Sequence, residues 1–280
     1  MARELRERFE NYMILKDLSK NTRKAYILRM EQLAKFYMRS PDELDNDEIQ
    51  KFLLYLIVSK KRAYDTVNQA FAAFRLFYGG LLRRDKTEFH IPSRPKTKKL
   101  PEVLSVEETV CVIDSTGNLK HRALLMTTYS AGLRVNEVTS LRPWHIESKR
   151  MLIRVDQGKG KKDRYTLLSQ KTLETLRDYW RAYRPGEWLF FGKDRGKPMP
   201  IGTAQRIYYN AKKRSGVNRG RGIHTLRHCF ATHLIDAGVD VYTVKRMMGH
   251  ASLSTTAKYV HVTKEKISKI VSPLDRHSGN

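Results

Sequence analysis

Residues 90–102 divide the chain into two parts that must fold separately. Three prolines and four cations lie among the dozen residues from His90 to Pro101. Proline lacks a backbone N–H and fixes φ, so such a segment is typical of an extended linker rather than of a helix or a central strand. The sequence therefore predicts a first domain over 1–89, a basic linker over 90–102 and a second domain over 103–280.

The first domain is patterned for helices throughout. Ser19 or Asn21 can cap the second of them. Apolar residues recur at helical spacing over four stretches, which are 3–17, the stretch from Tyr26 to Phe36, the stretch from Asp45 or Asn46 to Leu56, and Thr66–Leu82. Four amphipathic helices with short connections favour a small bundle.

The second domain mixes helices with a short stretch of strands. Ser105 and Glu108 have the spacing of a capping box, which marks the start of a helix. The period then changes, and two strands are expected around a hairpin turn at Gly158–Asp163. The expected strands are Met151–Val155 and Arg164–Leu168, and the expected helices are Leu119–Ser130, Gln170–Tyr183, Thr203–Arg214, Thr225–Ala237, Val241–Met248, Ser254–Tyr259 and a tail helix over 263–271. The fold class predicted is mainly α with a small β-sheet or hairpin.

The chain is strongly basic, with a formal net charge of +25 over 280 residues. Residues 1–102 carry +8 and residues 103–280 carry +17, so both parts favour one polyanionic partner, for which nucleic acid is the leading candidate. A membrane surface is disfavoured because no long basic amphipathic helix stands out. The longest apolar run, Phe52–Val58, is far below the roughly 18 residues that span a bilayer. We expect a cytoplasmic, nucleoid-associated protein without disulfides, since its two cysteines form no framework.

The last quarter of the chain gathers the side chains that can carry chemistry. His224, Arg227 and His228 are three and four residues apart, which places them on one face of a helix. His250 and Tyr259 follow, and few carboxylates accompany them. This set suits a phosphate that is held by positive charge and attacked by tyrosine. It suits a metal-dependent nuclease poorly, because ligands for the metal are lacking.

Each of these residues also has an ordinary structural interpretation. Arg134 could simply pair with Glu137, and Lys159 could belong to a solvated basic turn. His228 taken alone is best explained as a hydrogen-bonded buried histidine, and Tyr259 alone as a core tyrosine. A zinc site on His224 and His228 is disfavoured, since no further ligand is evident. One phosphate site nevertheless explains all the residues together better than five independent coincidences.

The ordered motifs resemble those of the tyrosine recombinase/integrase family, most closely its Xer-type members. They are, in chain order, Ser130-Ala-Gly-Leu-Arg134-Val-Asn-Glu137, Gly-Lys159-Gly, His224-Thr-Leu-Arg227-His228, Gly249-His250 and Thr255-Thr256…Tyr259. The N-terminal stretch from Leu18 to Tyr26 is similar to the opening of that family's core-binding domain. The resemblance implies a four-helix, SAM-like core-binding domain followed by an α+β catalytic domain.

The resemblance also implies a role for each matching residue. Arg134 and Arg227 would clamp the scissile phosphate, and Tyr259 would form a 3′-phosphotyrosine link. Lys159 would protonate the leaving 5′-oxygen. The remaining expectations are proton handling by His224 and His250, support of the neighbouring site groups by Glu137 and His228, and DNA contacts by Lys96, Lys98, Lys99, Lys161, Lys162 and Arg164. The implied chemistry needs neither a metal nor another cofactor.

The implied substrate is double-stranded DNA with an inverted-repeat core site. Two protomers would bind each site and four would form the synapse, which would exchange strands through a Holliday junction. A partner recombinase or accessory protein is a further expectation. Two alternatives stay open at this point: a topoisomerase-like relaxing enzyme with the same chemistry, and a non-catalytic DNA-binding regulator on the same fold.

Overall fold

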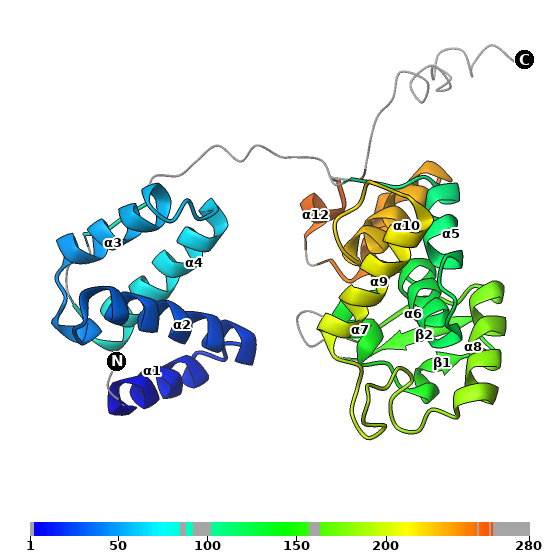
Figure 1. The fold of residues 1–280 in the computed structure, drawn as a ribbon, viewed down its shortest axis with the longest axis horizontal. Coiled ribbons are helices and arrows are strands. Elements are labelled where there is room, and N and C mark those ends of the chain that lie inside the picture. The colour runs from blue at the N-terminus through cyan, green and yellow to red at the C-terminus, as the bar shows by residue number, and fades with distance from the viewer. Residues whose placement is uncertain are drawn as a thin grey trace, which may run out of the picture. The chain divides into compact units, whose positions relative to one another are not determined.

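The computed structural model describes residues 3–84, 88–91, 102–156, 163–250, 252–257 and 259. The chain separates into two units, Met1–Thr97 and Lys98–Asn280 (Figure 1). Most of the predicted linker, at 92–101, and the predicted tail helix over 263–271 lie outside the described residues. The domain boundaries at 89 and 103 therefore stay predictions.

The first unit is helical over its described residues. Its elements are α1 (Arg3–Leu15), α2 (Lys20–Tyr37), the 3-10 turn η1 (Pro41–Glu43), α3 (Asn46–Val58), α4 (Tyr64–Arg75) and the π-helix η2 (Leu76–Leu81). Phe9, Phe52 and Phe74 are buried in one core formed by these helices. The predicted four-helix arrangement is confirmed.

Local signals set the helix ends of this unit. The Ser19 hydroxyl accepts a hydrogen bond from the backbone N–H of Thr22, and Asp45 forms a capping box with Glu48. The fourth helix differs from its predicted span because it begins at Tyr64 and changes to π geometry after Arg75. Gly80 lies in the π turn, where a Cβ would come within 2.8 Å of Tyr12 Oη.

The second unit contains a three-stranded antiparallel sheet in the order β1-β2-β3. Its elements are α5 (Val106–Asp114), α6 (Leu119–Ser130), α7 (Val135–Thr139), η3 (Pro143–His145), β1 (Ile146–Glu147), β2 (Leu152–Val155), β3 (Arg164–Leu167), α8 (Gln170–Tyr183), α9 (Ile201–Ser215), α10 (His224–Asp236), α11 (Val241–Met248) and α12 (Leu253–Ala257). The capping box at Ser105 and Glu108 is present as predicted. The mainly helical fold with a small sheet is confirmed.

The register of the sheet brings the start of β3 close to the end of β2. Ile146 lies opposite Ile153, and Val155 lies opposite Arg164. The predicted hairpin strands are therefore confirmed, although the turn at 157–162 lies outside the described residues. In Figure 1, α8 borders the sheet, whereas α10 and α12 lie at the other end of the unit.

Candidate active site

A tight turn after α6 directs Arg134. Gly132 in this turn has φ +60°, a conformation that side chains disfavour, and a Cβ there would collide with the ring of Phe230. Leu133 is buried, and Arg134 follows it as the N-cap residue of α7. The turn at Gly132-Leu133 thus fixes the backbone position from which the side chain of Arg134 extends.

Glu137 is the centre of a cluster of guanidinium groups. Its Oε1 and Oε2 accept bonds of 2.9 and 2.8 Å from Arg164, and its Oε1 accepts one of 2.7 Å from Arg134 Nη1. Arg227 Nη1 lies 3.6 Å from Oε2. Burial alone would raise the pKa of Glu137, but hydrogen bonds and charge from Arg164 and Arg134 lower it to about 2. One carboxylate therefore stays ionised among these cations.

Arg227 is buried in α10 and is 4% exposed. Its two terminal nitrogens donate to the carbonyl oxygens of Gly132 and Met248. Burial and the charge of Arg134 lower the pKa of Arg227 to about 9, which leaves the guanidinium charged at neutral pH. Arg134 Nη2 donates to the Gly249 carbonyl over 3.1 Å, so both arginines hold the chain at the end of α11.

Tyr259 lies in the same cluster, with its side chain pointing inward at 4% exposure. Its Oη is 2.6 Å from Nδ1 of His228, and its ring is nearly parallel to that of His250, with ring centroids 6.4 Å apart. Burial raises the pKa of Tyr259, while the charges of Arg227 and Arg134 partly oppose that effect. The phenol therefore lies within the electrostatic reach of both guanidinium groups.

The other two imidazoles differ in their surroundings. His250 follows the α11 cap Gly249, and its Nδ1 is 2.9 Å from the hydroxyl of Thr256. Burial and the charges of Arg227, Arg134 and Arg164 lower the pKa of His250 to about 4, so it is neutral at pH 7. His224 begins α10 on the solvent side, and partial burial and the same two arginines, Arg227 and Arg134, lower its pKa.

The structure thus brings together most of the predicted site residues. Arg134, Arg227, His228, His250 and Tyr259 gather around the Glu137 cluster, with His224 at its solvent side. The other expected cations, Lys159, Lys161, Lys162, Lys96, Lys98 and Lys99, lie outside the described residues. Their roles stay predictions.

Arg164 makes contacts within the protein that the sequence did not predict. Its side chain is 9% exposed, donates twice to Glu137, and donates from Nε to the Met247 carbonyl over 2.8 Å. The DNA contact that we expected of it stays a prediction. Alternation in β3 contained the signal, because Arg164 and Thr166 share the inward face of the strand. The apolar but exposed Tyr165 and Leu167 obscured that signal.

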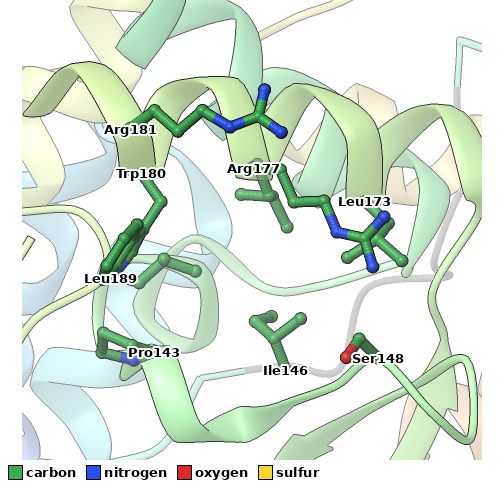
Figure 2. A pocket seen from close by; sticks show the side chains of 9 residues that line it. Pro143, Ile146, Ser148, Leu173, Arg177, Trp180, Arg181 and Leu189 are labelled. Atoms are coloured by element: carbon green, nitrogen blue, oxygen red, sulfur yellow. The ribbon is translucent and has the colours of Figure 1, made fainter. Parts of the chain in front are cut away.

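Among the described residues, no group of three or more His, Cys, Asp or Glu side chains could hold a metal ion. No described helix is long and apolar enough to cross a bilayer. A cavity of about 320 Å³ opens between α8 and the start of β1, where Trp180 and Leu189 face Pro143 (Figure 2). None of the predicted site residues lines that cavity.

Comparisons with known proteins identify the family of this chain. The phage integrase family pattern matches residues 97–266, and that of the phage integrase N-terminal SAM-like domain matches residues 5–88. The chain is 40% identical over 272 residues to y4qK, a candidate integrase/recombinase of Sinorhizobium fredii, covering 97% of this chain and 88% of the relative. It is 31% identical over 306 residues to the tyrosine recombinase XerC of Syntrophus aciditrophicus, covering 98% and 96%.

The fold has solved counterparts as well. A lambda integrase fragment, determined as a dimer bound to a COC′ core site, shares the fold with a TM-score of 0.74 at 17% identity, over 92% of this chain and 94% of that one. The two family patterns together cover most of the chain, and both relatives match it over nearly its whole length. The chain belongs to the phage integrase family and is an Xer-like tyrosine recombinase.

Proposed function

We propose that this protein is a site-specific DNA recombinase that cuts and rejoins DNA through a 3′-phosphotyrosine link to Tyr259. The observation that carries the proposal is the convergence of Arg134, Arg227 and Tyr259, which approach one point from the start of α7, from α10 and from the residues after α12. Family membership supports the same reaction class.

The charge balance of the cluster suits a phosphodiester. Arg134, Arg164 and Arg227 supply three positive charges against the single carboxylate of Glu137. The surplus lies mainly on Arg134 and Arg227, because Arg164 uses both terminal nitrogens on Glu137. Fixed guanidinium groups in a partly buried site stabilise the negative charge on the non-bridging oxygens of a pentacovalent phosphorus.

The reaction that we propose is a reversible transesterification. Tyr259 Oη attacks the phosphorus, the phosphorus–O5′ bond breaks, and Lys159 gives a proton to the departing 5′-oxygen. A 5′-hydroxyl from another strand then attacks the phosphotyrosine and restores a phosphodiester. The phosphotyrosine ester is similar in energy to the phosphodiester that it replaces, so the exchange requires no nucleotide cofactor.

The proposed substrate is duplex DNA with an inverted-repeat core site. The lambda integrase fragment, which was solved as a dimer on its core site, supports one protomer on each half of the repeat. Two such dimers would form a tetrameric synapse that exchanges strands through a Holliday junction. A partner recombinase or an accessory protein is compatible with this scheme.

The test is a covalent trapping assay. Nicked, radiolabelled site DNA is incubated with the full chain in EDTA, and the expected result is a protein–DNA adduct. Tyr259→Phe removes only the hydroxyl and should give no adduct while still binding DNA. Ligation between two different duplexes then separates recombination from relaxation. A wild-type chain that binds the site without any adduct would instead indicate a regulator.

A further inference from the structure

Two imidazoles, those of His228 and His250, lie against the phenol of Tyr259, and their interactions with it differ. His228, one turn after His224 on α10, places Nδ1 2.6 Å from Tyr259 Oη, with the two ring centroids 5.6 Å apart. His250 contacts the tyrosine through its ring face, and its Nδ1 is used by Thr256. Among the contacts described for these histidines, His228 is the one within hydrogen-bond distance of the phenolic oxygen.

We propose that His228 accepts the phenolic proton when Tyr259 attacks the phosphate, an inference that rests on the proposed function. In the tautomer with the proton on Nε2, the lone pair of Nδ1 points along the observed contact. The O–H bond of Tyr259 breaks as the Oη–phosphorus bond forms, and the proton moves to Nδ1. When a 5′-hydroxyl later displaces the tyrosine, the same proton returns from His228 to Oη.

Tyr259 needs such an acceptor because its ionisation in this site is unfavourable. A free tyrosine has a pKa of about 10, so about one in a thousand is ionised at pH 7. Burial raises the pKa of Tyr259 further, and the arginine charges only partly offset this. A base within hydrogen-bond distance removes the proton during attack, and such catalysis typically contributes about 10²–10⁴-fold.

Position singles out His228 among the three histidines, because its Nδ1 is 2.6 Å from Tyr259 Oη. The pKa of His250 falls to about 4, so it is a weak proton acceptor. His224 lies on the solvent side of the cluster. The charged and titratable groups that act on Tyr259 are Arg227 on α10, Arg134 before α7, and the histidines His228 and His250.

The same cations couple proton transfer to bound phosphate. The positive charges of Arg134 and Arg227 favour the phenolate form of Tyr259. The same charges disfavour a further positive charge nearby, such as an imidazolium at His228. A phosphodiester seated on the guanidinium groups neutralises part of that repulsion, and an imidazolium at His228 then costs less. His228 is therefore expected to accept the proton only after the phosphate is bound.

The experiment compares the pH dependence of single-turnover cleavage in the wild type and His228→Asn, from pH 6 to pH 10, on nicked site DNA. An asparagine can still accept a hydrogen bond near the position of Nδ1 but cannot take the proton. We expect a loss of about 10²–10⁴-fold at pH 7. The loss should shrink by about tenfold per pH unit as hydroxide replaces the missing base. His224→Asn, one turn earlier, should show a defect that does not depend on pH in this way.

A purely structural role of His228 predicts a different pH dependence of cleavage. A His228→Asn rate that is lower by one constant factor at every pH, or that stays within twofold of the wild type at pH 7, overturns the inference. Urea unfolding and DNA binding of the variant check its fold, and His228→Gln takes its place if the asparagine variant unfolds. Failure of the proposed function is recognised separately, because the wild type would then form no adduct, or an adduct would persist in Tyr259→Phe.

Discussion

Arg164 and Glu137 form a two-bonded ion pair, with nitrogen–oxygen distances of 2.9 and 2.8 Å, between the start of β3 and helix α7. Both side chains are less than a tenth exposed. Because Glu137 also accepts from Arg134, this pair fixes the position of an arginine that we propose clamps phosphate. Arg164 thus helps to position Arg134 through Glu137, which both arginines contact.

The ion pair should be visible as an energetic coupling between the two residues. We expect Arg164→Met to lower the free energy of unfolding by about 3 kcal/mol, the lower end for a broken buried pair, because Arg134 still neutralises Glu137. In Glu137→Gln/Arg164→Met the loss should be smaller than the sum of the single losses by about 1–3 kcal/mol. Urea denaturation of the four proteins measures this, and additive losses would contradict it.

Glu137 should make the protein sensitive to acid. Its pKa falls from 4.5 to about 2 in the folded chain, so it contributes stability above pH 4.5 that is lost as the pH falls toward 2. On going from pH 6 to pH 3.5, the titration of this residue alone should lower the free energy of unfolding by about 1.4 kcal/mol. The comparison is urea unfolding of the wild type and Glu137→Gln at both pH values. Equal decreases in the two proteins would show that the carboxylate titrates normally.

His250 should remain neutral in the free protein well below neutral pH. Its pKa is about 4, against an ordinary value of 6.5, because of burial and then the charges of Arg227, Arg134 and Arg164. Nitrogen-detected NMR of the ring should therefore show a neutral imidazole at pH 5.5. Site DNA should raise this pKa, since the phosphate offsets the arginine charges. A titration midpoint near 6.5 without DNA would be inconsistent with the described packing.

Gly249 should tolerate alanine much less well than a similar glycine elsewhere. Both Gly249 and Gly216 end helices with positive φ, at +61° and +73°. A Cβ at 249 would lie 2.9 Å from Cδ of Arg164, whereas nothing lies within 4 Å of a Cβ at 216. Both variants carry the backbone strain of about 1–2 kcal/mol, but Gly249→Ala must also displace Arg164.

We expect Gly249→Ala to lose cleavage activity as well as more stability, because the Gly249 carbonyl accepts from Arg134. Gly216→Ala should cleave nicked site DNA at a rate near that of the wild type. Parallel urea denaturation and single-turnover cleavage of the two variants measure both effects. Equal losses in the two variants would mean that the contact with Arg164 has no energetic weight.

Periodicity and capping signals predicted the long elements well. Leu119–Ser130, Gln170–Tyr183 and Val241–Met248 have the predicted bounds. Strand β1 and helix α7 were not predicted, because two and five residues are too few to show a period. Such short elements are set by their tertiary contacts.

The residues of the site were easier to find than their connections. Ordered motifs pointed to Arg134, Arg227 and Tyr259, and these residues do gather. The pairing of Arg164 with Glu137 joins positions 27 residues apart through the fold of the sheet, so no local spacing encodes it. The contact of His228 with Tyr259 spans 31 residues and depends likewise on tertiary packing.

Arg227 ties the turn at Gly132 to the end of α11 through two carbonyl oxygens. Such bonds hold the guanidinium in one orientation, so little side-chain freedom is left to lose when DNA arrives. The proposed catalytic role of Arg227 and the folding of the domain therefore depend on the same atoms. A laboratory search for more stable variants should leave this arginine untouched.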